Sequence, residues 1–186
     1  MQQTLLPLID ELDRLRVSRD DAWQIPRVEG DLLYHIALSM RAKTIVEVGT
    51  SYGFSGLFWA KALQQTGGQL HTIDRDPKKY TSSRETFTRA GVEQIVNNYL
   101  GEAQQVLANM SGPIDIGFID ADKPSTREYF DVLWPKIRVG GCVITDNAAT
   151  HRKELADFIS HVRALNNASS VEVNVGNGIE WTIKTE

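Results

Sequence analysis

The sequence predicts one α/β domain built on a doubly wound sheet, and three observations indicate this fold. Short runs of strand-forming residues alternate along the chain with stretches of helical period. The run at residues 44–48 leads into a turn with Gly49 and Gly53, an arrangement of strand, loop and helix that is typical of nucleotide sites. Two strand-like runs close the chain around residues 176–178, which predicts a hairpin.

The composition is that of a folded protein. The chain has 186 residues, the length of one domain, with 41% hydrophobic and 24% charged residues, which excludes disordered and fibrous classes. A net charge of −4 disfavours nucleic acid held by general electrostatics. No apolar run is long enough to span a bilayer, so we expect a cytoplasmic protein without membrane contact. Cys142 is the only cysteine, which excludes an internal disulfide and a cysteine-based metal site.

The N-terminal segment, residues 1–43, is expected to be helical. Leucine and isoleucine recur at helical spacing over residues 5–15, with acidic residues on the other side. This helix is expected to pack on the domain or on a second subunit, as in a homodimer. Pro26 keeps the residues before it extended, and a second helix is predicted over residues 29–40.

Strands and helices then alternate to the end of the chain. The Gly49 turn opens a helix that ends before Gly67, and Pro77 opens another that ends at Gly91. Residues 114–119 are apolar throughout, which predicts a strand buried on both faces. The predicted helices of this part cover residues 54–63, 77–90, 126–134 and 154–165, and the predicted strands cover residues 45–48, 70–73, 95–100, 114–119, 142–145, 171–175 and 179–184, with a turn at residues 140–141.

The Gly49 turn is expected to hold a cofactor that contains a ribose. Its spacing, Glu47-x-Gly49-x-x-x-Gly53, is neither the GxGxxG of dinucleotide sites nor a P-loop followed by GK[ST], which disfavours NAD and ATP. Asp74 ends the second predicted strand, about 25 residues after Gly49. At the tip of the neighbouring strand, its carboxylate can accept hydrogen bonds from both hydroxyls of a ribose.

Polar residues also follow two later strands at their carboxyl ends. Asp120 and Lys123 come after the fourth predicted strand, and Asp146 and Asn147 come after the fifth. Because ligands bind at the carboxyl ends of strands in such sheets, both groups can face one pocket. The two aspartates and the asparagine offer the oxygen ligands that Mg²⁺ prefers, with coordination sites left for two substrate oxygens. The alternative is that the aspartates only cap loops and that Lys123 is solvated.

Five motifs of the chain form a recognisable series. They are VEVGTSYGFSG, TIDRDP, LGEA, FIDADK and VITDN. In this order they resemble the class I S-adenosylmethionine-dependent methyltransferases, and more narrowly the cation-dependent catechol and caffeoyl-CoA O-methyltransferases. The resemblance covers residues 23–184 and implies a Rossmann-like sheet of seven strands, mostly parallel with an antiparallel last strand, and helices on both faces. Residues 1–186 are then expected to form a single methyltransferase domain.

The resemblance implies S-adenosylmethionine as the cofactor. Trp23 would lie near its methionine end with Ile25 beside it, unless Trp23 is only a packing anchor. Asp74 would hold the ribose, and residues 103–104 would touch the adenine edge, whereas Glu102 could equally be a first-turn acid of the next helix. The full set of implied cofactor-binding residues is Trp23, Ile25, Glu47, Gly49, Thr50, Ser51, Gly53, Ser55, Asp74, Arg75, Glu102, Ala103, Gln104 and Asp120.

Methyl transfer requires an acceptor oxygen that is deprotonated and aligned with the methyl carbon. A hydroxyl bound to Mg²⁺ at Asp120, Asp146 and Asn147 would have a lowered pKa. Lys123 matches the lysine of the family's DxxK motif and is the expected catalytic base. His151 follows Asn147 closely enough to touch a substrate, or else is a solvated loop residue.

We therefore expect an S-adenosylmethionine-dependent O-methyltransferase that methylates a hydroxyl of a catechol-like phenolic small molecule with the help of Mg²⁺. Family members commonly have a longer insertion after Asn147, so the acceptor site is expected to be more open here. One alternative acceptor is a hydroxylated nucleoside of tRNA, which requires a basic surface around the pocket. The candidates for that surface are Arg19, Arg27, Arg127, Arg152 and Lys153. The other alternative is a non-catalytic protein that binds S-adenosylmethionine.

Overall fold

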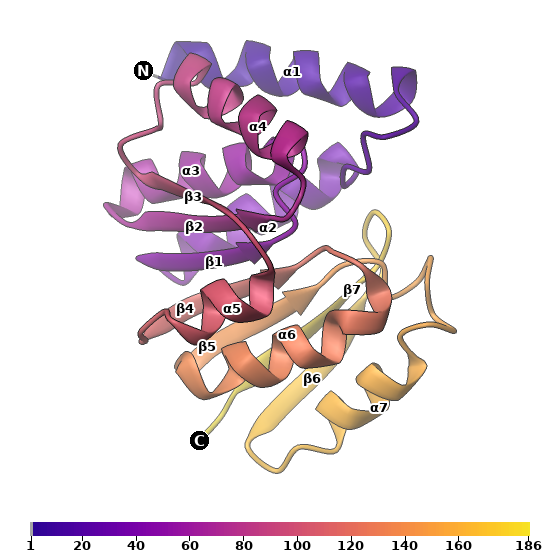
Figure 1. Ribbon diagram of the computed structural model, residues 1–186. Coiled ribbons are helices and arrows are strands. Elements are labelled where there is room, and N and C mark those ends of the chain that lie inside the picture. Colours follow the sequence, from indigo (N-terminus) through magenta and orange to yellow (C-terminus); the bar gives the residue numbers. More distant parts are fainter. Residues whose placement is uncertain (1) are drawn as a thin grey trace.

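The computed structural model describes residues 2–186 and contains a seven-stranded sheet (Figure 1). The strand order is β3-β2-β1-β4-β5-β7-β6. The strands are β1 (Thr44–Val48), β2 (Gln69–Asp74), β3 (Val96–Leu100), β4 (Ile114–Ile119), β5 (Ile137–Thr145), β6 (Ala168–Val173) and β7 (Ile179–Lys184). Strands β1 to β5 pair in parallel, whereas β7 is antiparallel to both β5 and β6. The predicted mostly parallel sheet with an antiparallel last strand is confirmed.

Helices cover both faces of this sheet. They are α1 (Gln2–Ser18), α2 (Arg27–Ser39), α3 (Phe54–Thr66), α4 (Pro77–Arg89), α5 (Ala103–Ala108), α6 (Thr126–Leu133) and α7 (Ala156–Arg163), with the 3₁₀ turns η1 (Lys123–Ser125) and η2 (Trp134–Lys136). Helices α1 to α4 pack on one face and α5 to α7 on the other (Figure 1). Neighbouring strand residues serve the two cores in turn, as Ile45 and Val46 do, because successive side chains of a strand point to opposite faces. None of the helices described here has the length and hydrophobicity needed to cross a bilayer.

The predicted elements agree with the structure to within a few residues, with one correction in β5. The sequence predicts a turn at residues 140–141, but β5 continues through them. Gly140 has a left-handed φ of 74°, and the register between β4 and β5 shifts in this part of the pair. A Cβ atom on Gly141 would lie 2.8 Å from the carbonyl oxygen of Asp115. The two glycines therefore produce an irregularity inside a strand, where the chain passes too close to its neighbour for a side chain.

The carboxyl ends of β1, β4 and β5 lie side by side, and Gly49 makes this possible. Its φ is 104°, and a Cβ atom there would overlap the carbonyl oxygen of Asp120. The parallel ladder continues up to the polar residues, since the Asp120 N–H donates to Val48 O at 2.9 Å and the Asp146 N–H donates to Ile119 O at 3.0 Å. Asp120 and Asp146 therefore leave adjacent strands at the same edge of the sheet.

Candidate active site

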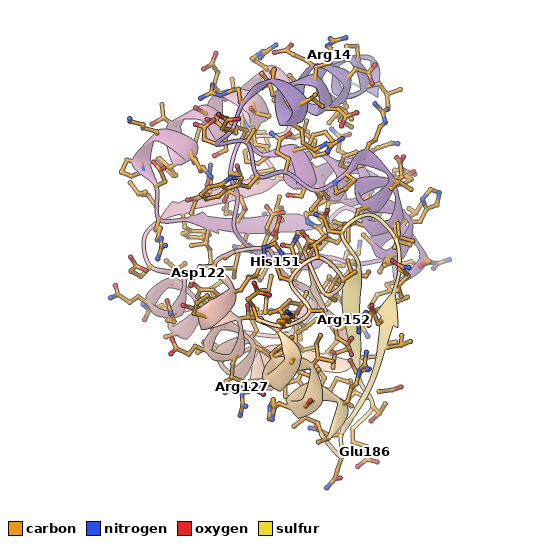
Figure 2. All side chains as sticks on the ribbon, turned by 90° about the vertical axis from the view of Figure 1, so that its right-hand side faces the viewer. Arg14, Asp122, Arg127, His151, Arg152 and Glu186 are labelled. Atoms are coloured by element: carbon orange, nitrogen blue, oxygen red, sulfur yellow. The ribbon has the colours of Figure 1, made fainter. Side chains whose placement is uncertain are left out.

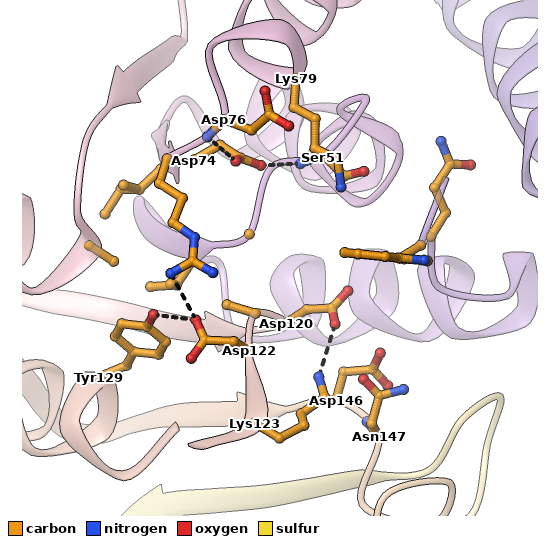
Figure 3. Close-up of a pocket in the computed structure, with 18 of the residues that line it drawn as sticks. Ser51, Asp74, Asp76, Lys79, Asp120, Asp122, Lys123, Tyr129, Asp146 and Asn147 are labelled. Carbon is orange, nitrogen blue, oxygen red and sulfur yellow. Dashed lines mark hydrogen bonds and ion pairs between the residues drawn. The ribbon is translucent and has the colours of Figure 1, made fainter. Parts of the chain in front are cut away.

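A cavity of about 660 Å³ opens at this edge of the sheet. Asp122 and His151, which both line it, mark the edge in Figure 2. Among the residues singled out in the sequence, the cavity is lined by Trp23, Gly49, Ser51, Asp74, Arg75, Glu102, Ala103, Asp120, Lys123, Asp146, Asn147 and His151. The structure thus brings the expected cofactor residues at the ends of β1, β2 and β3 together with the expected acceptor residues at the ends of β4 and β5 (Figure 3).

Asp74 is held by main-chain donors on both carboxylate oxygens. The Ser51 N–H donates to Oδ2 at 2.8 Å, and the Asp76 N–H donates to Oδ1 at 2.9 Å (Figure 3). Ser51 has a left-handed φ of 47°, which directs its N–H toward β2. A carboxylate oxygen accepts more than one hydrogen bond, so Asp74 remains able to bind hydroxyl groups in the cavity.

Glu47 lies beneath the Gly49 turn and does not line the cavity. The Thr72 hydroxyl donates to Glu47 Oε2 at 2.6 Å, and the hydroxyls of Thr50 and Thr72 are 2.6 Å apart. Burial raises the pKa of the Glu47 carboxyl to about 7. Glu47 and Thr50 therefore support the turn from below, tying the start of the loop to β1 and β2.

The other expected cofactor residues outside the cavity wall are Ile25, Gly53, Ser55 and Gln104. Ile25 is only 1% exposed and belongs to the core under α1 to α4, because its apolar side chain packs there. Gly53 has a φ of 86° and forms the N-cap of α3, where Ser55 is also buried. The Gln104 amide donates to Glu128 at 3.1 Å. These four residues do not line the cavity, and their expected roles in cofactor binding stay predictions.

Two carboxyl groups, the buried Asp146 and the partly buried Asp120, face each other at the acceptor end. Asp146 is 1% exposed, and burial together with the nearby Glu29 raises its pKa to about 7. Burial and the charge of Asp146 raise the pKa of Asp120 to about 8. Lys123 Nζ lies 3.5 Å from Asp120 Oδ1 (Figure 3). This end of the cavity therefore carries more negative than positive charge when its carboxyl groups are ionised.

The donor set at this end fits a hard divalent cation by its chemistry. Two carboxylates from adjacent strands and the Asn147 side chain are the oxygen donors that Mg²⁺ prefers. Asn147 has a left-handed φ of 68°, and its N–H donates to Asp146 Oδ1 at 2.5 Å. Within residues 2–186 no three His, Cys, Asp or Glu side chains are grouped so as to hold a metal. A cation here would depend on the asparagine and on acceptor or water oxygens.

Trp23 lies at the cavity with its side chain largely in solvent. It is 76% exposed, so it is not a packing anchor, and the Lys79 ammonium lies 4.6 Å from the centroid of its ring. Lys79 stands in the first turn of α4, directly after the Asp74 loop, and this position along the chain could have indicated it. Gln24 also lines the cavity, and its buried amide finds no hydrogen-bond partner among the described residues.

A second polar group spans the wall between β2 and β4. Tyr129 donates to Asp122 Oδ1 at 2.8 Å, and Arg75 Nη1 lies 3.9 Å from the same oxygen (Figure 3). Arg75 and Asp122 belong to recognised motifs, but Tyr129 is contributed by α6 and carries no motif. Asn177, from the turn between β6 and β7, also lines the cavity. It has no sequence signal, because its side-chain partner Asp146 is 31 residues away.

The order of the seven strands, with β7 antiparallel to its neighbours, is the Rossmann-like sheet of the class I methyltransferases. A solved methyltransferase of Podospora anserina in its S-adenosylhomocysteine-bound form shares the fold, with a TM-score of 0.88 and 20% sequence identity, over 98% of this chain and 88% of the other. More narrowly, this chain belongs to the O-methyltransferase family, whose model matches residues 4–172.

Curated relatives of this family are similar over part of their length. The chain is 35% identical over 131 residues to a catechol O-methyltransferase of Niastella koreensis, and the aligned region covers 68% of this chain and 59% of the relative. It is 31% identical over 158 residues to a flavonoid 3',5'-methyltransferase of Vitis vinifera, and this aligned region covers 76% of this chain and 67% of the relative. The chain thus spans roughly three fifths to two thirds of these two relatives.

Proposed function

We propose that this protein transfers the methyl group of S-adenosylmethionine to a hydroxyl of a catechol-like phenol with the help of a divalent cation. The observation that carries the proposal is a single cavity that joins Asp74, fixed by two main-chain donors, to the carboxyl pair Asp120 and Asp146. Two relatives that are named for methylation of catechol and of flavonoids support a phenolic acceptor.

The cofactor would occupy the part of the cavity at the ends of β1, β2 and β3. Asp74 would accept hydrogen bonds from the ribose hydroxyls, and the Gly49 turn would allow the backbone to approach the methionine part. Glu102 and Ala103, at the start of α5, would border the adenine ring. Trp23 would shield the methionine end from solvent. In this arrangement the cofactor would offer its methyl group to an acceptor held by the residues that follow β4 and β5.

The acceptor would lie against Asp120, Asp146 and Asn147, the residues that would hold the cation. When bound, such a cation supplies positive charge that lowers the pKa of a phenolic hydroxyl. Lys123, as the neutral amine, would take the hydroxyl proton at Nζ and then pass it to solvent. The phenolate oxygen would then attack the methyl carbon, forming an O–C bond as the S–C bond breaks, and S-adenosylhomocysteine would leave.

The tRNA alternative is less well supported by the surface charges. Four of the five arginine and lysine residues proposed for RNA contact form ion pairs with neighbouring acids: Arg19 with Asp21, Arg27 with Asp10, Arg127 with Asp131 and Arg152 with Glu172. Figure 2 labels two of these arginines, Arg127 and Arg152. Since the pairs neutralise much of this charge, a small acceptor agrees better with the structure. A non-catalytic protein that only binds S-adenosylmethionine would not explain why Asp120, Lys123 and Asp146 lie together at the cavity.

Cofactor binding is the first test. The purified protein would be titrated calorimetrically with S-adenosylmethionine, with NAD as the comparison ligand. We expect saturable binding of S-adenosylmethionine and none of NAD. A folded protein that binds neither ligand would contradict the proposed cofactor, whatever the acceptor is.

Transfer to catechol with Mg²⁺, and with EDTA in its place, is the second test. In the Asp146→Ala variant we expect cation-dependent transfer to fall by about a hundredfold or more, because several kcal/mol of charge stabilisation is lost. Affinity for S-adenosylmethionine should persist. Asp157→Ala, which removes an exposed acid in the first turn of α7, is the matched control. Unchanged transfer in Asp146→Ala would refute the role of the cation.

A further inference from the structure

The turn between β6 and β7, residues 174–178, reaches the acceptor end of the cavity. Its Asn177 lines the cavity together with Asp146 and Asn147. Figure 1 shows this turn as the yellow loop on the side of the sheet to which the parallel strands point. The C-terminal hairpin therefore contributes a residue to a site whose other members belong to β4 and β5.

Asn177 holds one oxygen of the Asp146 carboxylate. Its Nδ2 donates to Asp146 Oδ2 at 3.3 Å, while the Asn147 N–H donates to Oδ1 at 2.5 Å. With a donor on each oxygen, the carboxylate has one preferred orientation. Each oxygen retains a lone pair that is not used by these donors.

Asn177 is itself held by Glu29 of α2, which also contacts Asp146. Its N–H donates to Glu29 Oε2 at 3.1 Å, and Glu29 is fully buried. The neighbouring Gly176 has a φ of 61°, and a Cβ atom there would overlap the Glu29 carboxylate. No side chain fits between the turn and α2, so the position of Asn177 depends on direct contact with Glu29.

The same turn is bound to the loop that follows Asn147. The Ala148 N–H donates to Gly178 O at 2.8 Å, and the N–H groups of Ala149 and Thr150 donate to Asn177 O at 3.2 Å. A Cβ atom on Gly178 would lie 2.5 Å from Ala149 Cβ. Main-chain bonds on one side and Glu29 on the other thus fix the turn against Asp146.

We propose that Asn177, seated by Glu29, is a positioning residue that orients the Asp146 carboxylate for a divalent cation. The inference rests on the proposed function, in which Asp146 is one of the groups that hold the cation. Partners that orient a ligand group typically affect metal affinity by about 10- to 100-fold. Loss of the Asn177 amide should therefore weaken cation binding. It should not affect cofactor binding, because Asp74, the residue expected to bind the ribose, belongs to another strand.

The test uses Mn²⁺ as the probe, with free Mn²⁺ counted by electron paramagnetic resonance, and S-adenosylmethionine affinity measured in parallel by calorimetry. In Asn177→Ala we expect Mn²⁺ affinity to fall by about 10- to 100-fold, with the thermal midpoint and the cofactor affinity unchanged. Asn174→Ala is the matched control, an exposed asparagine of the same turn, and should bind Mn²⁺ as the wild type does.

A second variant displaces Asn177 without removing a polar group. Gly176→Ala should push the turn away from Glu29 and weaken Mn²⁺ binding as well. Gly91→Ala is its control, because Gly91 has a similar φ of 66° with no atom within 4 Å of the added Cβ, so it carries the same backbone strain without the collision. A loss in Gly176→Ala but not in Gly91→Ala supports seating by Glu29, and equal behaviour of the two contradicts it.

The outcomes separate this inference from the proposed function. Wild-type protein that binds S-adenosylmethionine but no Mn²⁺ would overturn the cation part of the proposed function and this inference with it. Wild-type protein and Asn177→Ala that bind Mn²⁺ equally would overturn the inference alone. A fall in Mn²⁺ affinity that is matched by a fall in the thermal midpoint and in cofactor affinity would also overturn it, because the residue would then be merely structural.

Discussion

Main-chain N–H groups fix carboxylates at both ends of the cavity. Asp74 receives two of them and Asp146 receives one, and each donor belongs to a turn that directly follows or faces a strand end. Charge-assisted bonds of this kind are stronger than neutral ones. The two aspartates are therefore oriented by the backbone before any ligand arrives. Glu47 is different, since its carboxyl is buried below the loop and serves the protein itself.

Asp74→Ala tests the cofactor end. The variant should lose about 10- to 100-fold in affinity for S-adenosylmethionine, because hydrogen bonds to a charged group contribute about 1.5–3 kcal/mol. Calorimetric titration measures the change. Asp20→Ala, at an exposed position outside the cavity, is the control. Equal affinity in both variants would mean that the ribose is held elsewhere.

Glu47→Gln tests the cost of the buried carboxyl. The pKa of Glu47 is raised from 4.5 to about 7 in the folded protein, so ionisation of this carboxyl destabilises the fold. The destabilisation is absent below the pKa of the unfolded chain and complete above the pKa of the folded protein. We expect the wild type to lose about 3 kcal/mol of unfolding free energy relative to the variant between about pH 4 and about pH 8. Urea unfolding at both pH values measures this. A constant difference between the two proteins would show that Glu47 keeps its ordinary pKa.

Helix α2 links the core to the acceptor end of the cavity. Its first turn carries Glu29, which contacts the β6–β7 turn, and the next residue, Gly30, packs on α3. A Cβ atom on Gly30 would lie 2.5 Å from the ring of Phe58. The separation of α2 and α3 therefore sets the position of Glu29 as well.

Gly30→Ala tests this close approach. Alanine favours a helix over glycine by about 1 kcal/mol, so an open site would be stabilised by the substitution. Here we expect a net loss of about 1–3 kcal/mol in unfolding free energy from overpacking against Phe58. His35→Ala, at an exposed position of the same helix, should change stability little. Stabilisation of Gly30→Ala would show that the helices are not in such close contact.

The elements were predictable to the extent that their signals are local. Periodicity and glycine or proline boundaries predicted the strands, and the strand ends predicted where Asp74, Asp120 and Asp146 lie. The irregularity at residues 140–141 was not predictable, because its cause is the neighbouring strand. Asn177 was missed for the same reason, since its N–H meets Glu29 across 148 residues of sequence.

The molecule divides its cavity between two groups of strands. The ends of β1, β2 and β3 form the expected cofactor part, and those of β4 and β5, with the β6–β7 turn, form the expected acceptor part. One core on each face of the sheet supports both parts. Ligands at the two ends should therefore bind to the same sheet through largely different side chains, with Asp120 expected in both sets.

Thermal unfolding tests this division in the whole protein. S-adenosylmethionine at about a hundred times its dissociation constant should raise the midpoint by about 5–10 °C, the effect of about 2.7 kcal/mol on a chain of this length. The increase should persist in EDTA, because Asp120 is the one residue expected in both sets, and Asp74 and the Gly49 turn are not among the residues proposed for the cation. Loss of the increase in EDTA would show that the cofactor end depends on the cation.

The contact between Asn177 and Glu29 joins a late part of the chain to an early one, so it can form only near the end of synthesis. Ribosomal synthesis delivers residues 44–100, with the Gly49 turn and Asp74, well before residues 174–184. A nascent chain can build its first three strands while Asp146 still lacks its donor from the last hairpin. The acceptor end is therefore completed late, after β7 has paired with β5, and until then this carboxylate has only one of its two donors.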